Sequence, residues 1–210
     1  MEFRGSFSDG FSEKGSAYFG NLTSRCKPIL DYQVRLRRFT NTFTSRINLY
    51  KLHGSIDQYS VNNLLDQFEV IKIPYGVAPY TVFEERVSGT GQIFSQRQDI
   101  LIFPYFLSGT NEKVKSYTTT SYFSPLMEQF QINLRNSEVL IVIGYGFKDS
   151  MINEFISNNF SSKERKLMII IDTQNPISNF KHNCKVEHFK SGIENFDSTE
   201  MRILLKDYID

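Results

Sequence analysis

The chain has 210 residues, with 24 basic and 23 acidic side chains, so its formal net charge is only +1 at pH 7. This near balance argues against a protein that binds nucleic acid through an extended basic surface. Two cysteines, Cys26 and Cys184, are too few for a four-cysteine zinc site or a disulfide-rich secreted fold, so we expect free thiols and no metal. No segment has the pattern of a signal peptide or of a membrane-spanning helix, and we expect a cytoplasmic protein.

The first part of the chain shows no regular hydrophobic period. In residues 1–46, glycines recur among serines and phenylalanines, which predicts an irregular, loop-rich segment. The one basic cluster of the chain also lies here and comprises Arg35, Arg37 and Arg38. A short cluster of this kind is typical of a solvated face.

The middle of the chain predicts two short strands and a helix. Ile47–Leu52 is a candidate strand that stops at Gly54, and Ile100–Phe103 is a second one that ends at a proline. A helix follows, beginning near Ser121 or at the pair Ser124–Pro125, which suits an N-cap and a first helical residue.

The last third alternates continuous apolar strands with amphipathic helices. The elements are a strand over Val139–Ile143, a helix over 150–159, a strand over Leu167–Ile171, a short strand over Val186–Phe189 and a helix capped by Asp197. This alternation is typical of a parallel sheet covered on both faces. We therefore predict an α/β fold, with a Rossmann-like doubly wound parallel sheet that lacks its first half.

A glycine turn follows the first of these strands. Gly144, Tyr145, Gly146 and Phe147 lie where the strand would end, and ligands of open α/β sheets bind outside the carboxyl ends of the strands. The dinucleotide fingerprint needs a third glycine where this chain has Asp149, so that motif is not matched. A carboxylate there would repel a phosphate, and we expect a sugar hydroxyl near the turn instead.

Two acidic residues and one histidine are candidates for contact with such a ligand. Asp149 could bind a ligand or simply cap the next helix, and Asp172 could bind ribose hydroxyls or only form a strand-end turn. His53 lies between Leu52 and Gly54. An imidazole has an intrinsic pKa of about 6.5, so it can accept a proton from a ribose hydroxyl near neutral pH. A lone histidine beside a strand is also commonly structural.

Three motifs in order resemble a known family. They are Lys51–Ser55 (KLHGS), Phe103–Thr110 (FPYFLSGT) and Ile143–Asp149 (IGYGFKD), the last followed by Asn153. Their order resembles bacterial sirtuin-like domains of the zinc-free branch found in anti-phage defence systems, in which the domain hydrolyses NAD⁺. The resemblance covers roughly residues 45–176.

The resemblance implies a role for each matching residue. His53 matches the active-site histidine that acts on the nicotinamide ribose, and the turn from Gly144 to Phe147 matches the cofactor-contacting turn. Asp149 and Asn153 match polar positions that open the next helix, and Asp172 matches a ribose-binding strand end. The implied reaction cleaves the nicotinamide–ribose bond of NAD⁺ through an oxocarbenium-like centre, with water as acceptor.

The family's glycine-rich pyrophosphate turn and its threonine-asparagine-tyrosine-aspartate motif do not occur in this chain. The resemblance therefore implies that residues 1–210 are the C-terminal portion of one sirtuin-like domain. Its parts would be an irregular segment 1–46, a middle region 47–137 with the histidine motif, and a βαβ nucleotide-binding portion 138–210.

Two functional hypotheses follow. One is an NAD⁺ hydrolase, active when the missing half is supplied, and the other is an inactive nucleotide-sensing or scaffolding module. In both, the expected partners are a nucleotide ligand and either a second copy or a partner subunit, because a sheet cut in half exposes apolar edges. Contact with nucleic acid or a membrane is not expected.

Overall fold

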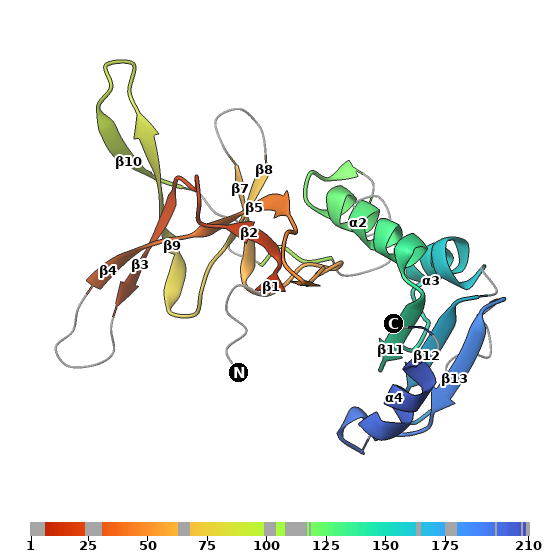
Figure 1. Cartoon of the computed structure of the whole chain (residues 1–210). Helices are drawn as coiled ribbons and strands as arrows, with labels where there is room; N and C mark the ends of the chain where they lie inside the picture. The colour runs from red at the N-terminus through yellow and green to blue at the C-terminus, as the bar shows by residue number, and fades with distance from the viewer. Residues whose placement is uncertain are drawn as a thin grey trace. The chain divides into compact units, whose positions relative to one another are not determined.

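The computed structural model describes residues 7–23, 31–62, 68–98, 104–107, 117, 119–162, 165–174, 180–195, 197–206 and 208 (Figure 1). The chain divides into two compact units, Met1–Met127 and Glu128–Asp210, and each is described by itself. Within the described ranges, no helix is both long and apolar enough to cross a membrane.

The N-terminal unit is built from antiparallel β-sheets. Its strands are β1 (Phe7–Ser8), β2 (Gly10–Ser12), β3 (Tyr18–Thr23), β4 (Asp31–Arg35), β5 (Arg37–Thr42), β6 (Ile47–Asn48), β7 (Gln58–Asn62), β8 (Phe68–Lys72), β9 (Val77–Val87) and β10 (Ile93–Arg97). One four-stranded sheet has the order β10-β9-β3-β4 and the other has the order β2-β5-β8-β7. The short strands β1 and β6 pair in parallel.

The two four-stranded sheets share one hydrophobic core. Tyr18 of β3 and Val82 of β9 pack in the same cluster as Val61 of β7 and Ile71 of β8, and each of these side chains is almost fully buried. Burial of this apolar surface from both sheets is the main force that holds the unit together.

The predicted irregular segment 1–46 is wrong, because five strands begin within its described residues. The register shifts between Gly10 and Phe11 and again between Gly20 and Leu22. Such bulges interrupt the two-residue alternation that marks a strand in a sequence. The predicted strand Ile47–Leu52 is reduced to Ile47–Asn48, and the predicted strand Ile100–Phe103 lies outside the described residues.

The C-terminal unit contains a small parallel sheet with helices. Its elements, with the helix that leads into it, are α2 (Phe123–Asn136), β11 (Val139–Ile143), α3 (Ser150–Ile156), the π-helical turn η1 (Ser157–Ser161), β12 (Leu167–Ile171), β13 (Lys185–Phe189), the 3₁₀ turn η3 (Ile193–Asn195) and α4 (Ser198–Leu205). The sheet has the order β11-β12-β13, and both strand pairs are parallel.

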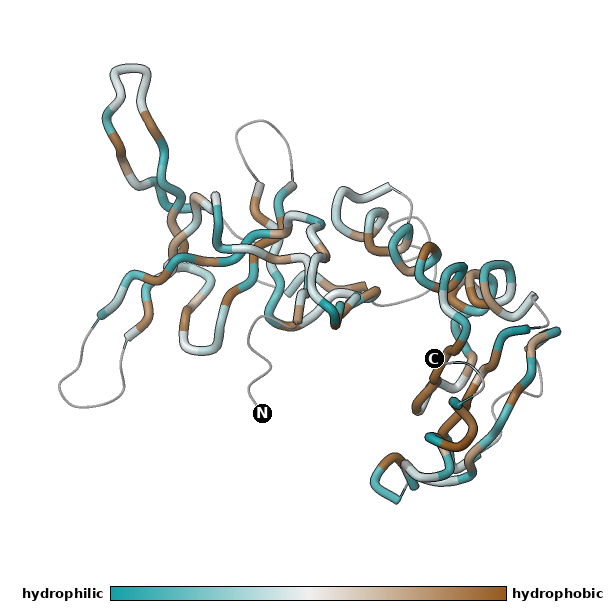
Figure 2. The backbone as a smooth tube through the Cα atoms, in the orientation of Figure 1, coloured by the Kyte–Doolittle hydropathy of each residue, from teal (hydrophilic) through white to brown (hydrophobic). Residues whose placement is uncertain are grey.

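The central strand β12 organises this unit. All five of its residues are buried, and Figure 2 draws it as a continuously hydrophobic stretch. On one face, Leu167, Ile169 and Ile171 pack against apolar residues of α4, among them Met201 and Leu204. The three strands and the Asp197 cap were predicted from the sequence, and the structure confirms them. The helix predicted over 150–159 begins at Ser150 as expected, but it is α-helical only to Ile156 and continues as η1.

The predicted fold class is nevertheless wrong. The chain is mixed α/β, and most of its strands lie in antiparallel sheets, so it does not form a Rossmann-like doubly wound parallel sheet lacking its first half. The prediction extended the βαβ rhythm of the last third to the whole chain. In the structure, this alternation is limited to the sheet of β11, β12 and β13.

Candidate functional site

The carboxyl ends of β11 and β12 bring two predicted site residues together. Ile143 and Ile171 are register partners in the parallel sheet, and Gly144 and Asp172 each follow one of them directly. The Gly144 amide donates a hydrogen bond to the Ile171 carbonyl oxygen at 3.2 Å, and the Asp172 amide donates to the Phe189 carbonyl oxygen at 3.2 Å. Gly144 and Asp172 are therefore neighbours at the edge where ligands of parallel sheets bind.

At this edge, Gly144 leaves its backbone accessible. Its backbone has a positive φ of 62°, a conformation that glycine adopts without a steric penalty. A Cβ atom built at this position would meet nothing within 4 Å. The backbone at Gly144 is therefore accessible to a ligand group.

The turn after Gly144 is braced by its own side chains. The Tyr145 hydroxyl donates to Asn153 Oδ1 at 2.9 Å and lies 3.2 Å from the Asp149 carbonyl oxygen, while Asn153 Nδ2 donates to the Phe147 carbonyl oxygen at 2.7 Å. Burial, helped by the Asp149 charge, raises the pKa of Tyr145 to about 12, so its hydroxyl keeps its proton. Tyr145 and Asn153 thus hold the shape of the turn, including Phe147 at its positive φ of 50°.

Asp149 caps α3. Its Oδ1 accepts hydrogen bonds from the amides of Met151 and Ile152, each at 3.2 Å. Of the two roles that the sequence left open, the structure shows the N-cap. These amides are therefore already paired with a carboxylate and do not offer a phosphate site.

Asp172 forms a strand-end turn, because its Oδ1 accepts a hydrogen bond from the Gln174 amide at 2.9 Å. This is the alternative role considered for it. Its carboxyl group is partly exposed and lies at the same edge as Gly144.

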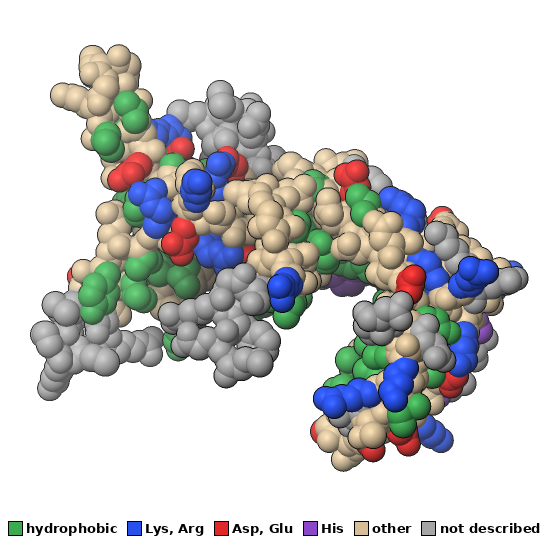
Figure 3. Space-filling model, viewed as in Figure 1, with side chains coloured by type: hydrophobic (Ala, Val, Ile, Leu, Met, Phe, Trp, Pro, Cys, Tyr) green, Lys and Arg blue, Asp and Glu red, His purple; other side chains and the backbone are tan. Residues whose placement is uncertain are grey.

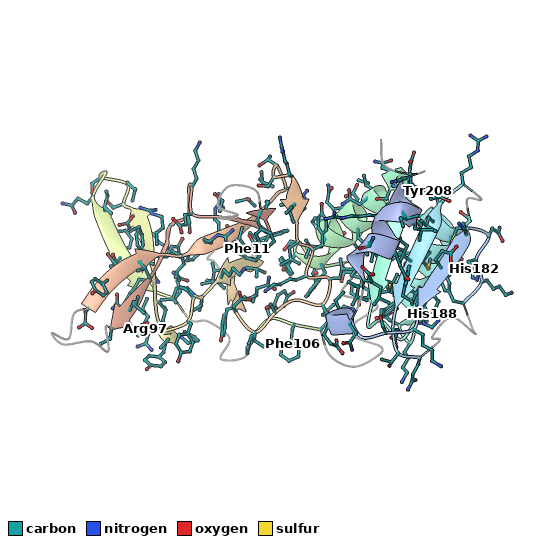
Figure 4. All side chains as sticks on the ribbon, turned by 60° about the horizontal axis from the view of Figure 1, so that its bottom comes forward. Phe11, Arg97, Phe106, His182, His188 and Tyr208 are labelled. Carbon is teal, nitrogen blue, oxygen red and sulfur yellow. The ribbon has the colours of Figure 1, made fainter. Side chains whose placement is uncertain are left out.

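His188 belongs to this edge and was given no role in the sequence analysis. Its Nε2 donates to the Asp172 carbonyl oxygen at 3.0 Å, so it fixes the backbone of the neighbouring strand end. Figure 4 labels His182 and His188 in the C-terminal unit. The signal available in the sequence was the position of His188, one residue before the end of the third parallel strand.

An aromatic cluster continues from the turn. The Phe147 ring centroid lies 4.9 Å from that of Tyr145 and 5.0 Å from that of Phe180, and Phe180 stacks with His182 at 6.5 Å. Of these four residues, only Tyr145 and Phe147 were predicted to belong to a site.

His53 lies in the N-terminal unit, whereas the other predicted site residues lie in the C-terminal unit. Its side chain is exposed, and its ring stacks on Tyr117 with centroids 6.0 Å apart. Its carbonyl oxygen accepts a hydrogen bond from the Leu107 amide at 2.8 Å, and Gly54 forms a β-bridge with Phe106. The first motif and the described part of the second, residues 104–107, are therefore in direct contact.

A charged network in the N-terminal unit was missed by the sequence analysis. The nearly buried carboxylate of Asp9 pairs with Arg37 and with Lys72, whose Nζ lies 2.6 Å from Asp9 Oδ2 and 3.3 Å from Asp57 Oδ2. Burial alone would raise the pKa of Asp9, but the hydrogen bonds and charges of Lys72 and Arg37 outweigh it, and this pKa is lowered.

Beside this network lies a cavity of about 260 Å³, lined by Glu13, Arg35, Leu36, Arg37, Asp57, Lys72 and Pro74. Its three cationic side chains face two acidic ones, and Lys72 and Arg37 are already paired. Arg37, which the sequence analysis placed on a solvated face, is 38% exposed and in addition pairs with the nearly buried Asp9. In the described part of the chain, no three histidine, cysteine, aspartate or glutamate side chains come together as a metal site would require.

Comparison with known proteins gives no relative: no protein-family model matches the chain, and no curated protein is significantly similar to it. The resemblance to sirtuin-like domains therefore stays a prediction from the order of three motifs.

Proposed function

We propose that the C-terminal unit binds the sugar part of a nucleotide at the carboxyl edge of β11 and β12, with NAD⁺ as the ligand. The observation that supports this proposal is the open Gly144 backbone beside Asp172. A glycine without a Cβ lets a ribose approach the main chain, and a carboxylate accepts hydrogen bonds from ribose hydroxyls. The braced turn keeps this surface in one conformation before the ligand arrives.

The proposed contact is with sugar and not with phosphate. The Asp149 carboxylate already accepts hydrogen bonds from two amides in the first turn of α3. Its negative charge would also repel a phosphate placed there. The amide groups that bind pyrophosphate at helix N-termini in dinucleotide-binding folds are therefore taken in this helix.

Replacing Gly144 by alanine should weaken NAD⁺ binding about tenfold, which corresponds to about 1.4 kcal/mol, because the new methyl group occupies the space offered to the ribose. Gly91→Ala is a matched control, since Gly91 also has a positive φ and an open Cβ position but lies in the β9–β10 turn. Isothermal titration calorimetry gives the affinities, and thermal unfolding should show similar stability losses for both variants. Unchanged affinity in Gly144→Ala would remove this edge from the proposed site.

Hydrolysis of NAD⁺ is the second candidate function, and the exposed imidazole of His53 is the observation that favours it. In this reaction the bond between nicotinamide and C1′ of the ribose breaks, and the oxygen of a water molecule bonds to C1′. Nicotinamide leaves with the bonding electrons, and the water loses a proton. His53 would accept the proton of a ribose hydroxyl as positive charge develops on the sugar, and the proton lost by the water would then restore that hydroxyl, so that one proton is released overall.

Incubation with NAD⁺ should release nicotinamide, measured by chromatography, and His53→Ala should abolish the release. Tyr75→Ala is the control, because Tyr75 is also an exposed ring of the N-terminal unit, at 95% exposure, but lies outside the three motifs. Equal release by His53→Ala and the wild type would exclude His53 from the chemistry. NAD⁺ binding that depends on Gly144, with no release from any variant, would assign the chain to nucleotide sensing without catalysis.

A further inference from the structure

The parallel sheet has two edges of opposite character. The edge strand β13 contains Lys185, Glu187 and His188, whereas the edge strand β11 reads Val-Leu-Ile-Val-Ile. Figure 2 shows this contrast between a hydrophobic β11 and a mixed β13. Charged side chains on an edge strand discourage pairing with other strands. β13 is thus suited to solvent, while β11 has no such protection.

One face of β11 is also covered only in part by the described residues. α4 packs over the central strand and reaches Val139 of β11, but Ile141 and Ile143 on the same face are 41% and 53% exposed. Figure 3 shows hydrophobic side chains on the surface in the region of β11. An apolar strand with an unprotected edge and exposed isoleucines is a surface for strand addition.

We propose that β11 pairs in antiparallel fashion with β11 of a second copy, which joins two three-stranded sheets into one of six strands. A two-fold axis at Ile141 sets Ile141 opposite the partner's Ile141 and Ile143 opposite the partner's Val139. Directly opposed residues of an antiparallel pair point to the same face. The exposed isoleucines of both copies therefore meet on one face of the joined sheet.

The charge pattern favours a second copy as the occupant. Self-pairing brings no like charges together, because β11 carries none and the flanking Glu138 falls opposite the partner's Gly144. The interface is isologous and closes at two subunits. It involves the five residues of β11 from each copy, a contact of the size that weak, transient complexes have, so we expect the dimer to dissociate on dilution.

Sedimentation equilibrium between about 1 µM and about 500 µM, a range that spans weak dimers, tests this interface. The wild type should shift from monomer to dimer, and Ile141→Lys should stay monomeric because the pairing buries two unpaired lysines near the axis. Ile93→Lys is the matched control: Ile93 is 71% exposed on β10, an edge strand of another sheet, and this variant should dimerise like the wild type.

Hydrogen exchange measured on the wild type tests the interface without a substitution, so its result does not depend on whether a variant folds. The amides of Val139–Ile143 should become more protected as the protein concentration rises, while those of β13 do not change. A wild type that stays monomeric throughout, an Ile141→Lys variant that dimerises normally, or dimerisation with unchanged exchange in β11 would each overturn the proposal. Loss of the dimer in Ile93→Lys would overturn it as well.

Discussion

Asp9→Ala is expected to lower the free energy of unfolding by about 3–5 kcal/mol, the usual cost of breaking a buried ion pair by removing one partner. The Asp9 side chain is 3% exposed and is held by Arg37 and Lys72. Its Oδ1 also accepts a hydrogen bond from the Phe11 amide at 3.3 Å. Removal of the carboxylate leaves Arg37 without this ion pair, and Lys72 keeps only Asp57, whose Oδ2 lies 3.3 Å from its Nζ.

Urea denaturation followed by circular dichroism measures this loss. Asp31→Ala is the control, because Asp31 is an exposed carboxylate with a hydrogen bond from Thr23 Oγ1 at 2.7 Å, and exposed interactions of this kind contribute about 1 kcal/mol or less. Similar losses for the two variants would show that the Asp9 network does not stabilise the unit.

The same network determines how the free energy of unfolding changes with pH. The pKa of Asp9 in the folded protein is lowered from 3.8, its ordinary value, so the unfolded chain takes up a proton first as the pH falls. The stabilisation is therefore complete well above that value and is lost as the pH falls through the folded pKa. The stability difference between the wild type and Asp9→Ala should be constant near pH 7 and should shrink below about pH 4.

The sequence predicted the C-terminal unit well because its signals are local. The strand Leu167–Ile171 is continuously apolar, as a buried parallel strand is. The caps at Asp149 and Asp197 depend on residues within three positions of each. The sequence placed Gly144 and Asp172 each at a strand end, and the structure adds that these two strands pair in parallel, with Ile143 opposite Ile171.

The N-terminal unit could not be predicted in this way, because its pairing partners are far apart in the chain. β5 pairs with β8 so that Arg37 lies opposite Lys72, and the carboxylate that joins them comes from Asp9, 63 residues before Lys72. Nothing near Arg37 in the sequence indicates this contact. The apparent solvated cluster was therefore partly an ion-pair network of the fold.

The roles of the turn residues also needed side-chain positions. Asn153 was expected to face a ligand, but its amide nitrogen donates to Phe147 and its oxygen accepts from Tyr145. His53 depends on residues more than fifty positions later, since Leu107 and Tyr117 contact it. The order of the motifs could not separate a ligand contact from a structural one.

Gly54→Ala is expected to destabilise the N-terminal unit by about 2–5 kcal/mol, through two causes that a control can separate. The residue has a positive φ of 80°, which costs an alanine about 1–2 kcal/mol. The new Cβ would also overlap the Tyr105 carbonyl oxygen and lie 2.8 Å from Phe106 Cα. These are backbone atoms, so relief requires the β-bridge to open, and overpacking of this kind adds about 1–3 kcal/mol.

Gly91→Ala isolates the first cause, because Gly91 has a φ of 82° and an open Cβ position; its loss should stay near 1–2 kcal/mol. Chemical denaturation of both variants gives the difference, and equal losses would refute the steric contribution at Gly54. A larger loss at Gly54 means that packing against Tyr105 and Phe106 requires the glycine of the histidine motif. His53→Ala keeps these backbone contacts but removes the ring contact with Tyr117, so its free energy of unfolding should be measured beside any change in its reaction with NAD⁺.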